Sequence, residues 1–343
     1  MQVAMYYNNR DVRLEEMPVP EIGPDEMLMR VEASGICGSD VLEWYRVRKA
    51  PLVLGHEVSG TVAETGSAIK RYRVGDRIAA GHHVPCLTCH YCMNGHETAC
   101  DTLRTTTFYP GGFAEFVRLP AINCDRGIYP LPDTVDFEEG TFAEPLACVL
   151  RGQRAAGLEP ALSVLVLGAG ISGLLHIALA RATGAGRIMA TDVNAYRRKA
   201  AALFGADAVF EPSDNIPARV KEVNKGRLAD RVIVCTGAMP AVQQALDCVD
   251  RGGTVLFFAS TKPGEVFPLN TERTFWRTDI TLTTSYAGSP ADHVKALELI
   301  RSRAVPVKDM VTHRLPLAES GKGFWLVAEA RESIKVIIKP QEQ

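Results

Sequence analysis

Residues 163–192, SVLVLGAGISGLLHIALARATGAGRIMATD, decide the fold of the central part of the chain. An apolar run at 164–167 enters a glycine-rich turn, and the turn opens an apolar stretch at 171–182 that we expect to be helical. The turn contains Gly168, Gly170 and Gly173. The first glycine forms the turn, the second lets the backbone approach a pyrophosphate, and the third allows close helix packing. N–H groups at the helix start favour an anion. The stretch predicts a dinucleotide-binding strand, turn and helix; the alternative is a tight turn without a nucleotide.

An acidic residue ends the next predicted strand. Asp192 comes about 20 residues after the glycines, where a carboxylate accepts hydrogen bonds from the ribose hydroxyls of NAD and repels the 2′-phosphate of NADP. NAD is therefore favoured, while Arg197 and Arg198 follow closely and leave NADP open. The candidate cofactor-binding residues are Gly168, Gly170, Ile171, Ser172, Gly173, Asp192, Arg197 and Thr236.

Two patterns divide the chain. In the first third, short alternating segments such as 26–33 lie between Pro and Gly breakers, which predicts a β-rich region. From 163 to 285, apolar strands alternate with helical segments, which predicts a parallel sheet with right-handed crossovers. The uncharged stretch 161–180 has the length of a membrane span, but its glycines and His176 favour a strand, a turn and a helix instead.

Composition excludes several classes of protein. The 343 residues suggest about two domains, and 38 Lys and Arg against 40 Asp and Glu give no general attraction to nucleic acid or an anionic membrane. No secretory leader is visible, so we expect a reducing cytoplasm. There, nine Cys favour metal binding or free thiols over disulfides.

Four of the nine Cys lie close together, in the pattern C-x2-C-x2-C-x7-C. Four thiolates close a tetrahedral site without water, which is typical of a structural zinc; an iron–sulfur cluster is the rival interpretation. The ligands are Cys86, Cys89, Cys92 and Cys100, while Cys124, Cys148, Cys235 and Cys248 are predicted to be small core residues.

A second set of metal-binding residues is dispersed. Cys37, the pair His56-Glu57, and Glu144 combine one thiol, one imidazole and carboxylates. Such a set leaves a coordination position for water or a substrate alcohol, as catalytic zinc requires.

At these residues the sequence resembles the zinc-dependent medium-chain dehydrogenase/reductase family, closest to its sorbitol and threonine dehydrogenase branch. Gly55-His56-Glu57 with Gly60, Gly66 and Ile69 fits the family's zinc signature, and Glu144-Pro145-Leu146 matches the polyol branch. The resemblance covers nearly the whole chain. It implies an α/β protein with a GroES-like β-rich catalytic domain from residues 1–148 and 289–343, a structural zinc lobe at 82–104, and a doubly wound Rossmann NAD-binding domain at 149–288.

The resemblance also implies roles. Cys37, His56 and Glu144 would hold the catalytic zinc, and Glu57 would enter its coordination sphere when water leaves. Asp40 is expected to accept a hydrogen bond from the free ring nitrogen of His56, and Ser39 to take the proton of the substrate. Many relatives carry a His where this chain has Leu42, so the onward route of the proton is open.

Substrate contacts are less well defined. Glu43, Trp44 and Ser285 are the candidates, and the basic run Arg46, Arg48, Lys49 either meets an acidic group of the substrate or forms a solvated turn. We expect hydride transfer to NAD from a secondary alcohol of a polyol, cyclitol or related hydroxylated small molecule. The alternatives are an L-threonine 3-dehydrogenase-like enzyme, a simple secondary alcohol dehydrogenase and a non-catalytic nucleotide-binding zinc protein. A homodimer or homotetramer is implied.

Overall fold

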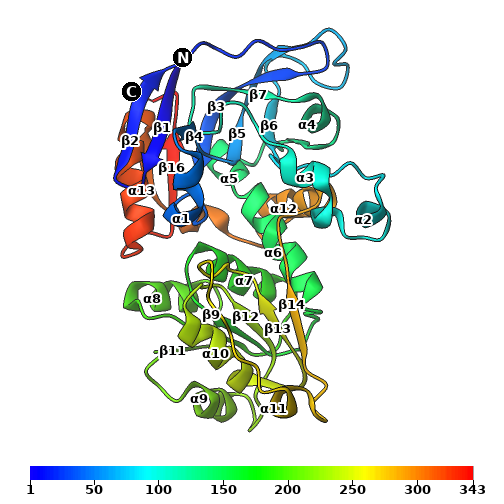
Figure 1. Ribbon diagram of the computed structural model, residues 1–343, viewed down its shortest axis with the longest axis vertical. Helices are drawn as coiled ribbons and strands as arrows, with labels where there is room; N and C mark the ends of the chain where they lie inside the picture. The colour runs from blue at the N-terminus through cyan, green and yellow to red at the C-terminus, as the bar shows by residue number, and fades with distance from the viewer. Residues whose placement is uncertain (343) are drawn as a thin grey trace. The chain divides into compact units, whose positions relative to one another are not determined.

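The computed structural model describes residues 1–342, and the chain divides into two compact units (Figure 1). Unit 1 contains Met1–Ala147 and Ala287–Gln343, so it draws on both ends of the chain. Unit 2 is Cys148–Tyr286. Unit 1 contains two sheets and unit 2 contains one, and the buried apolar clusters lie within the units.

Unit 2 is built on a six-stranded, wholly parallel sheet with the strand order β11-β10-β9-β12-β13-β14. Chain order reverses beside β9, and the carboxyl ends of strands at such a reversal are where doubly wound sheets bind ligands. The strands are β9 (Val164–Leu167), β10 (Ile188–Thr191), β11 (Ala208–Phe210), β12 (Ala229–Val234), β13 (Val249–Phe257) and β14 (Thr281–Thr284). The helices are α7 (Ile171–Ala182), α8 (Ala195–Leu203), α9 (Ile216–Val223), α10 (Met239–Cys248) and α11 (Thr271–Phe275), and α6 (Ala143–Ala155) precedes them.

Unit 1 contains a seven-stranded sheet of mixed direction and a three-stranded antiparallel sheet, β2-β1-β4. The larger sheet runs β15-β16-β3-β5-β6-β8, with β7 also paired to β3. The strands are β1 (Gln2–Asn8), β2 (Asp11–Glu16), β3 (Met27–Gly35), β4 (Leu52–Val53), β5 (Glu57–Thr65), β6 (Arg77–Ala80), β7 (Phe116–Leu119), β8 (Ile128–Pro130), β15 (Val311–Pro316) and β16 (Lys335–Lys339). The α-helices are α1 (Glu43–Arg46), α2 (His90–Met93), α3 (Asp101–Thr105), α4 (Ala121–Arg126), α5 (Phe137–Gly140), α12 (Pro290–Arg301) and α13 (Ser320–Glu329), and the short 3-10 helices are η1 (Val47–Lys49), η2 (Glu97–Ala99), η3 (Val307–Met310) and η4 (Leu317–Glu319).

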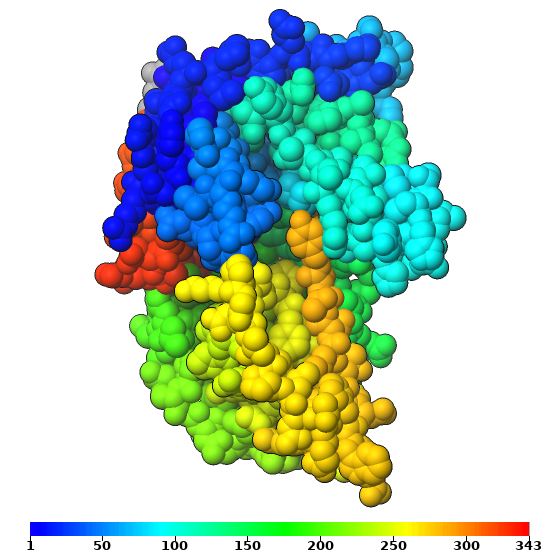
Figure 2. Space-filling model, in the orientation of Figure 1, coloured from blue at the N-terminus to red at the C-terminus, as the bar shows by residue number. Residues whose placement is uncertain are grey.

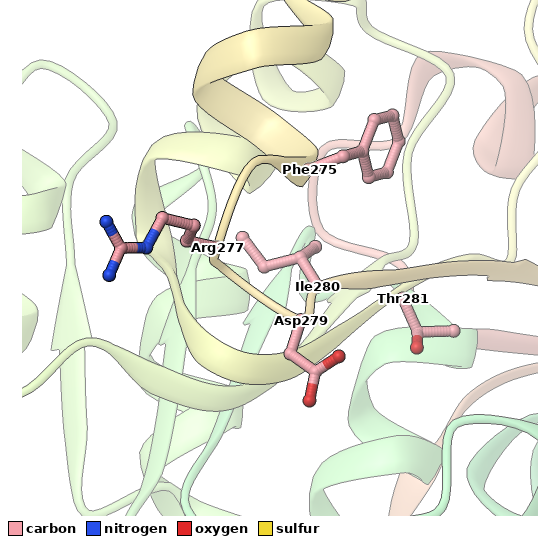
Figure 3. A pocket seen from close by; sticks show the side chains of 5 residues that line it. All are labelled: Phe275, Arg277, Asp279, Ile280 and Thr281. Atoms are coloured by element: carbon pink, nitrogen blue, oxygen red, sulfur yellow. The ribbon is translucent and has the colours of Figure 1, made fainter.

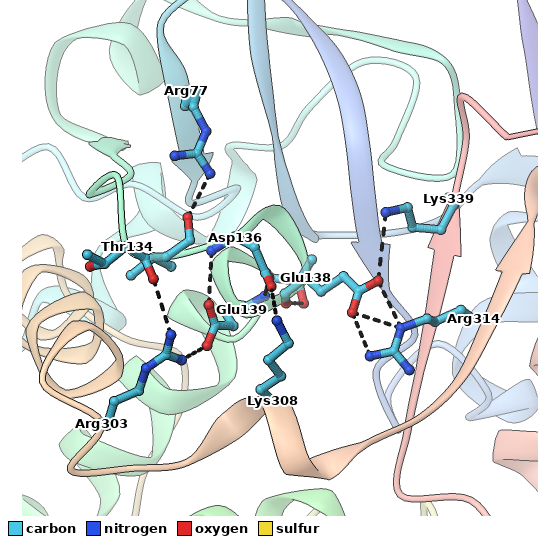
Figure 4. Close-up of polar contacts among 11 residues, drawn as sticks. Arg77, Thr134, Asp136, Glu138, Glu139, Arg303, Lys308, Arg314 and Lys339 are labelled. Atoms are coloured by element: carbon cyan, nitrogen blue, oxygen red, sulfur yellow. Dashed lines mark hydrogen bonds and ion pairs between the residues drawn. The ribbon is translucent and has the colours of Figure 1, made fainter.

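The two chain ends of unit 1 are joined by strand pairing and by ion pairs. The last strand, β16, lies antiparallel to β3, with Ile337 opposite Gly35. Around α5, acidic residues pair with cations of the C-terminal segment (Figure 4). These pairs are Arg303 with Glu139, Lys308 with Asp136, and Arg314 and Lys339 with Glu138. The C-terminal segment is therefore fixed to the same sheet that carries the N-terminal strands.

The parallel sheet and the β-rich unit confirm the predicted fold class. The helix expected at 171–182 has those bounds, and the uncharged stretch 161–180 forms β9, the glycine turn and most of α7. No helix within residues 1–342 is both long and apolar enough to span a membrane. The prediction for the remaining Cys was partly wrong: Cys124 and Cys248 are buried, but Cys148 and Cys235 are only half-buried.

Candidate metal and nucleotide sites

The four clustered Cys form a compact lobe in unit 1, which projects from the surface of that unit in Figure 2 (cyan). The lobe is built from α2, η2 and α3 with the turns between them, and Arg126 of α4 donates to the Cys86 carbonyl oxygen at 2.6 Å. Its thiol sulfurs all lie within 4.8 Å of one another. Leu87, Tyr91 and Met93 of the lobe are exposed, so an ion at its centre would contribute much of its stability.

The spacing of the sulfurs fits a single metal ion. Cys86 and Cys92 are 4.0 Å apart at Sγ, and the pairs Cys89–Cys92 and Cys86–Cys100 are each 3.6 Å apart. Four sulfurs about 2.3 Å from a tetrahedral zinc lie about 3.8 Å from one another. A multi-iron cluster would need more room between thiolates that bind different irons. The N–H of Cys89 also donates to Cys86 Sγ at 3.3 Å, as suits a thiolate.

A second group of metal donors brings together three residues of unit 1. Cys37 follows β3, His56 precedes β5, and Glu57 begins β5, whose pairing with β3 sets Gly35 opposite Glu57. One donor atom from each residue lies within 4.8 Å of the others. A thiol, an imidazole and a carboxylate are the ligands of an open zinc site, so the donor set fits that ion.

Glu144, the predicted third ligand, lies outside this three-residue group, in the first turn of α6. Glu57, expected as an adjacent carboxylate, takes the third place among the described donors. A role for Glu144 as a ligand stays a prediction.

The carboxylate of Asp40 contacts the His56 ring at Nδ1. Its Oδ1 is 3.4 Å from His56 Nδ1, and its Oδ2 accepts from the N–H of Cys37 at 3.0 Å. Burial raises the pKa of the Asp40 carboxyl, but the charges and hydrogen bonds of His56, Arg46 and Cys37 outweigh it and hold the pKa below its ordinary value. Asp40 is therefore an anion that orients the His56 ring.

Sequence reasoning missed a buried cation beside Glu57. Lys335, the first residue of β16, is fully buried and pairs through Nζ with Glu57 Oε2. The same ammonium lies 3.4 Å from the Ile36 carbonyl oxygen and 5.5 Å from the centre of the Phe142 ring. A side chain at Gly35 would collide with both members of the pair, so only glycine fits there. A lone Lys at the start of the apolar run KVIIK was the only signal in the sequence.

Two further histidines lie near His56. The ring of His82 is 4.7 Å from that of His56 and 3.8 Å from that of His83, measured between centroids. Burial lowers the pKa of His82 well below its ordinary value, and burial lowers that of His83 to about 4. Both rings are thus neutral near pH 7. The adjacent pair His82-His83, just before the Cys lobe, could have drawn attention in the sequence.

In unit 2 the glycine turn has the geometry that its sequence predicts. Gly168 has a positive φ of 96°, which glycine adopts without strain. A Cβ on Gly173 would collide with the Gly168 carbonyl oxygen, so the third glycine permits the close approach of α7. Ile171 and Ser172 form the start of α7, and Thr236 lies beside Gly168.

Asp192 is 8% exposed and also supports the turn. Its Oδ2 accepts from the N–H of Ala169 and its Oδ1 from the N–H of Asn194, each at 2.8 Å. A carboxylate has further lone pairs, so these bonds fix its position and leave it able to accept from hydroxyls.

The two arginines behind Asp192 differ. Arg197 points toward the turn, with Nη1 3.6 Å from where a Cβ of Gly170 would lie, and its Nε is buried with no partner among residues 1–342. Arg198 instead donates to the carbonyl oxygens of Asp192 and Val193, so it holds the backbone.

The candidate substrate residues do not form one cluster within a unit. Glu43 accepts from the N–H of Asn9 at 3.1 Å, and the Trp44 ring lies 5.9 Å from that of Tyr45. Ser285, in unit 2, has a buried hydroxyl without a partner among the described residues. A surface cavity of about 470 Å³ next to β14 is lined by Phe275, Arg277, Asp279, Ile280 and Thr281, and it holds none of the predicted site residues (Figure 3).

Comparison with known families matches both units of the chain. The family model described as "Alcohol dehydrogenase GroES-like domain" matches residues 23–133, and that described as "Zinc-binding dehydrogenase" matches residues 172–302.

Similarity to curated relatives and to solved structures covers nearly the whole chain. "Probable D-xylulose reductase A" of Aspergillus clavatus is 35% identical over 95% of this chain and 93% of its own, and sorbitol dehydrogenase of Ovis aries is 34% identical over 97% and 95%. A zinc-binding dehydrogenase of Sinorhizobium meliloti 1021, solved bound to NADP, has a TM-score of 0.88 at 30% identity over 99% of both chains. Galactitol-1-phosphate dehydrogenase of Escherichia coli has a TM-score of 0.86 at 25% identity over 99% and 100%.

Proposed function

This chain belongs to the zinc-dependent medium-chain dehydrogenase family, and we propose that it oxidises a secondary alcohol of a polyol, a cyclitol or a related hydroxylated small molecule with NAD as hydride acceptor. One observation carries the proposal: the open donor group of Cys37, His56 and Glu57 occurs in the same chain as the dinucleotide turn. Relatives similar over almost their full length are named for polyols and for a ketose formed from one.

Cys37, His56 and Glu57 would hold the catalytic ion, and Glu144 remains a candidate to join them. A zinc ion held there would make a bound alcohol more acidic, and bound NAD would be the acceptor for hydride from the alcohol carbon. Asp40 keeps the His56 ring in place through Nδ1, and Lys335 keeps Glu57 in place through Oε2. Asp40 belongs to the N-terminal segment of unit 1 and Lys335 to its C-terminal segment. The position of the donor group therefore depends on the packing of these two chain segments against each other.

Ser39 is proposed to take the proton of the substrate hydroxyl at Oγ. It lies two residues beyond Cys37, and its N–H donates to Cys37 Sγ at 3.4 Å, which fixes the Ser39 backbone beside the donor group. As the substrate proton arrives at Oγ, Ser39 releases its own proton toward solvent. General base catalysis of this kind contributes about 10²-fold or more to a rate.

The glycine turn and Asp192 are proposed to bind the adenosine half of NAD. The N–H groups at the start of α7 would face the pyrophosphate, and Asp192 would accept from ribose hydroxyls. Arg197, beside Gly170, would meet a phosphate oxygen. Thr236, in the loop after β12, completes the proposed cofactor contacts.

The proposal extends to location and assembly. A cytoplasmic location is supported by the cysteines, which form no disulfide within residues 1–342, as a reducing compartment favours. The assembly is proposed to be a homodimer or homotetramer, on the family resemblance alone.

A substrate panel tests the function. Purified protein is incubated with NAD and, separately, with sugar alcohols, cyclitols, threonine and other hydroxyamino acids, and simple secondary alcohols, and NADH formation is followed by absorbance. We expect the highest kcat/KM on a polyol or a cyclitol. Preference for threonine would assign the other branch, and no NADH with any alcohol would contradict the proposal.

A further inference from the structure

Arg46 makes a three-point contact with the two residues that follow the Cys37-Gly38 dipeptide. Its Nε donates to the Ser39 carbonyl oxygen at 3.0 Å, and its Nη2 lies 3.2 Å from Ser39 Oγ and 3.3 Å from Asp40 Oδ1. The Arg46 side chain is 15% exposed, and the Asp40 side chain is fully buried. The guanidinium is therefore hydrogen-bonded within the protein and largely shielded from solvent.

The local helix brings Arg46 to this place. The N–H of Arg46 donates to the Leu42 carbonyl oxygen at 3.0 Å, so the two residues are one helical turn apart and share a face. Leu42 has no atom that can carry a proton. Arg46 is the side chain of this face that reaches the Ser39 hydroxyl, and the Tyr45 ring, 4.8 Å from the guanidinium carbon, covers it.

The chemistry of a guanidinium limits what this contact can do. Arg has five N–H donors and no acceptor, and it keeps its charge at any pH at which a protein is folded. In the hydrogen bond with Arg46, Ser39 Oγ is therefore the acceptor, and the O–H of Ser39 must point to a different partner. Arg46 also cannot receive a proton from Ser39.

Asp40 makes the arrangement rigid. Its Oδ1 lies within 3.4 Å of both Arg46 Nη2 and His56 Nδ1, so one buried carboxylate oxygen holds the guanidinium on one side and the imidazole on the other. Asp40 thus fixes the position of the His56 ring directly and that of the Ser39 hydroxyl through Arg46. A displacement of Arg46 would shift the hydroxyl without removing any donor of the metal group.

We propose that Arg46 is a positioning residue for Ser39: its N–H occupies one lone pair of Oγ and thereby turns the Ser39 O–H toward solvent and leaves the other lone pair free to accept the proton of the reacting alcohol. The inference rests on the proposed function. It also reassigns the first cation of the basic run, because Arg46 serves the Ser39 hydroxyl, whereas Arg48 and Lys49 are exposed.

A double-mutant cycle tests the proposal. The kcat of the wild type, Arg46→Gln, Ser39→Ala and the double variant are measured on the best alcohol of the panel. We expect Ser39→Ala to lower kcat by about 10²-fold, and Arg46→Gln to lower it by about 10-fold when Ser39 is present. When Ser39→Ala is already in place, Arg46→Gln should cost less than about 2-fold, because the group it positions is absent. Arg46→Lys should recover part of the loss, since one donor can still reach Oγ.

Controls separate the inference from a structural role and from the proposed function. Lys70→Gln, at an exposed residue that belongs to none of the candidate sites, should leave kcat unchanged, and Arg46→Gln should retain the zinc content of the wild type. Equal losses with and without the Ser39 hydroxyl, or loss of zinc from Arg46→Gln, would overturn the role assigned to Arg46 while the dehydrogenase function stands. A wild type without activity on any alcohol refutes the function before the variants are compared, and the inference falls with it.

Discussion

Lys335 and Glu57 form a buried ion pair between the last strand and the strand that carries the metal donors. Both side chains are at most 1% exposed, and 278 positions separate them in the sequence. Burial of two charges is costly, and it is tolerated here because each member compensates the other. The packing of the C-terminal strand into unit 1 therefore helps to position Glu57, a candidate metal ligand.

Removal of the lysine should destabilise the protein strongly. Lys335→Met leaves Glu57 as an unpaired buried anion, so we expect a loss of about 3–5 kcal/mol in the free energy of unfolding, measured with urea in the presence of a chelator. Lys335→Met combined with Glu57→Gln should recover most of that loss. Lys339→Met, on the same strand but half-buried and 3.7 Å from Glu138, is the control and should cost under about 1 kcal/mol. Equal effects at the two lysines would contradict this account.

Local sequence predicted the parts of the site whose residues lie close together in the chain. Cys86 to Cys100 and the glycine turn each occupy a single short segment, so their spacing can be recognised in the sequence and narrows the ligands that they can bind. Lys335 could not be predicted, because its partner lies on a strand from the other end of the chain. Arg46 was visible as one of three neighbouring cations, but only its low exposure distinguishes it from Arg48 and Lys49.

Glu144 and Glu57 illustrate a different limit. Both are carboxylates of the family pattern, and the resemblance implies Glu144 as the ligand and Glu57 as the adjacent carboxylate. The pairing of β5 with β3 brings Glu57 to Cys37, while Glu144 starts a helix that follows α5. Strand pairing, which the sequence pattern does not encode locally, is what brings Glu57 close to the thiol.

The four-Cys lobe should bind one zinc independently of the other site. Cys89→Ser removes one of four ligands, so we expect elemental analysis to find one zinc fewer per chain and hydrogen exchange to show lost protection at residues 86–105. Cys124→Ser, at a buried thiol outside the lobe, serves as the control. Unchanged zinc in the Cys89→Ser variant would refute a structural zinc here.

Acid should destabilise unit 2 through His176. The ring is fully buried between Gln153 and Phe258, and burial lowers its pKa to about 3 from an ordinary value of 6.5. Because the folded state holds the neutral ring, its contribution to stability is complete above pH 6.5 and is lost as the pH falls toward 3. Between pH 7.5 and pH 5 the loss is about 2 kcal/mol.

Thermal unfolding of a variant measures this contribution. His176→Leu should have a smaller fall in Tm between pH 7.5 and pH 5 than the wild type, by several degrees. His96→Leu, at an exposed histidine, should keep the wild-type pH dependence. Identical falls for the wild type and His176→Leu would show that this ring is not a source of acid sensitivity.

Asp192 should determine the choice between NAD and NADP. Asp192→Asn removes the charge that repels a 2′-phosphate and keeps one oxygen to accept a backbone N–H, so we expect the ratio of kcat/KM for NAD over NADP to fall at least about 10-fold. Asp207→Asn changes a carboxylate that bonds Ile188 and Arg181, away from the turn, and should leave the ratio unchanged. A ratio unaffected by Asp192→Asn would assign cofactor choice to other residues.

Cys37, His56 and Glu57 are proposed to hold a catalytic zinc separate from that of the Cys lobe. Zinc per chain and NADH formation, measured on the same preparations of wild type and Cys37→Ser, test it most directly. We predict two zinc ions per chain and polyol-dependent NADH formation for the wild type, and one zinc without measurable turnover for the variant. Two zinc ions retained by Cys37→Ser, or turnover at the wild-type rate, would contradict the account.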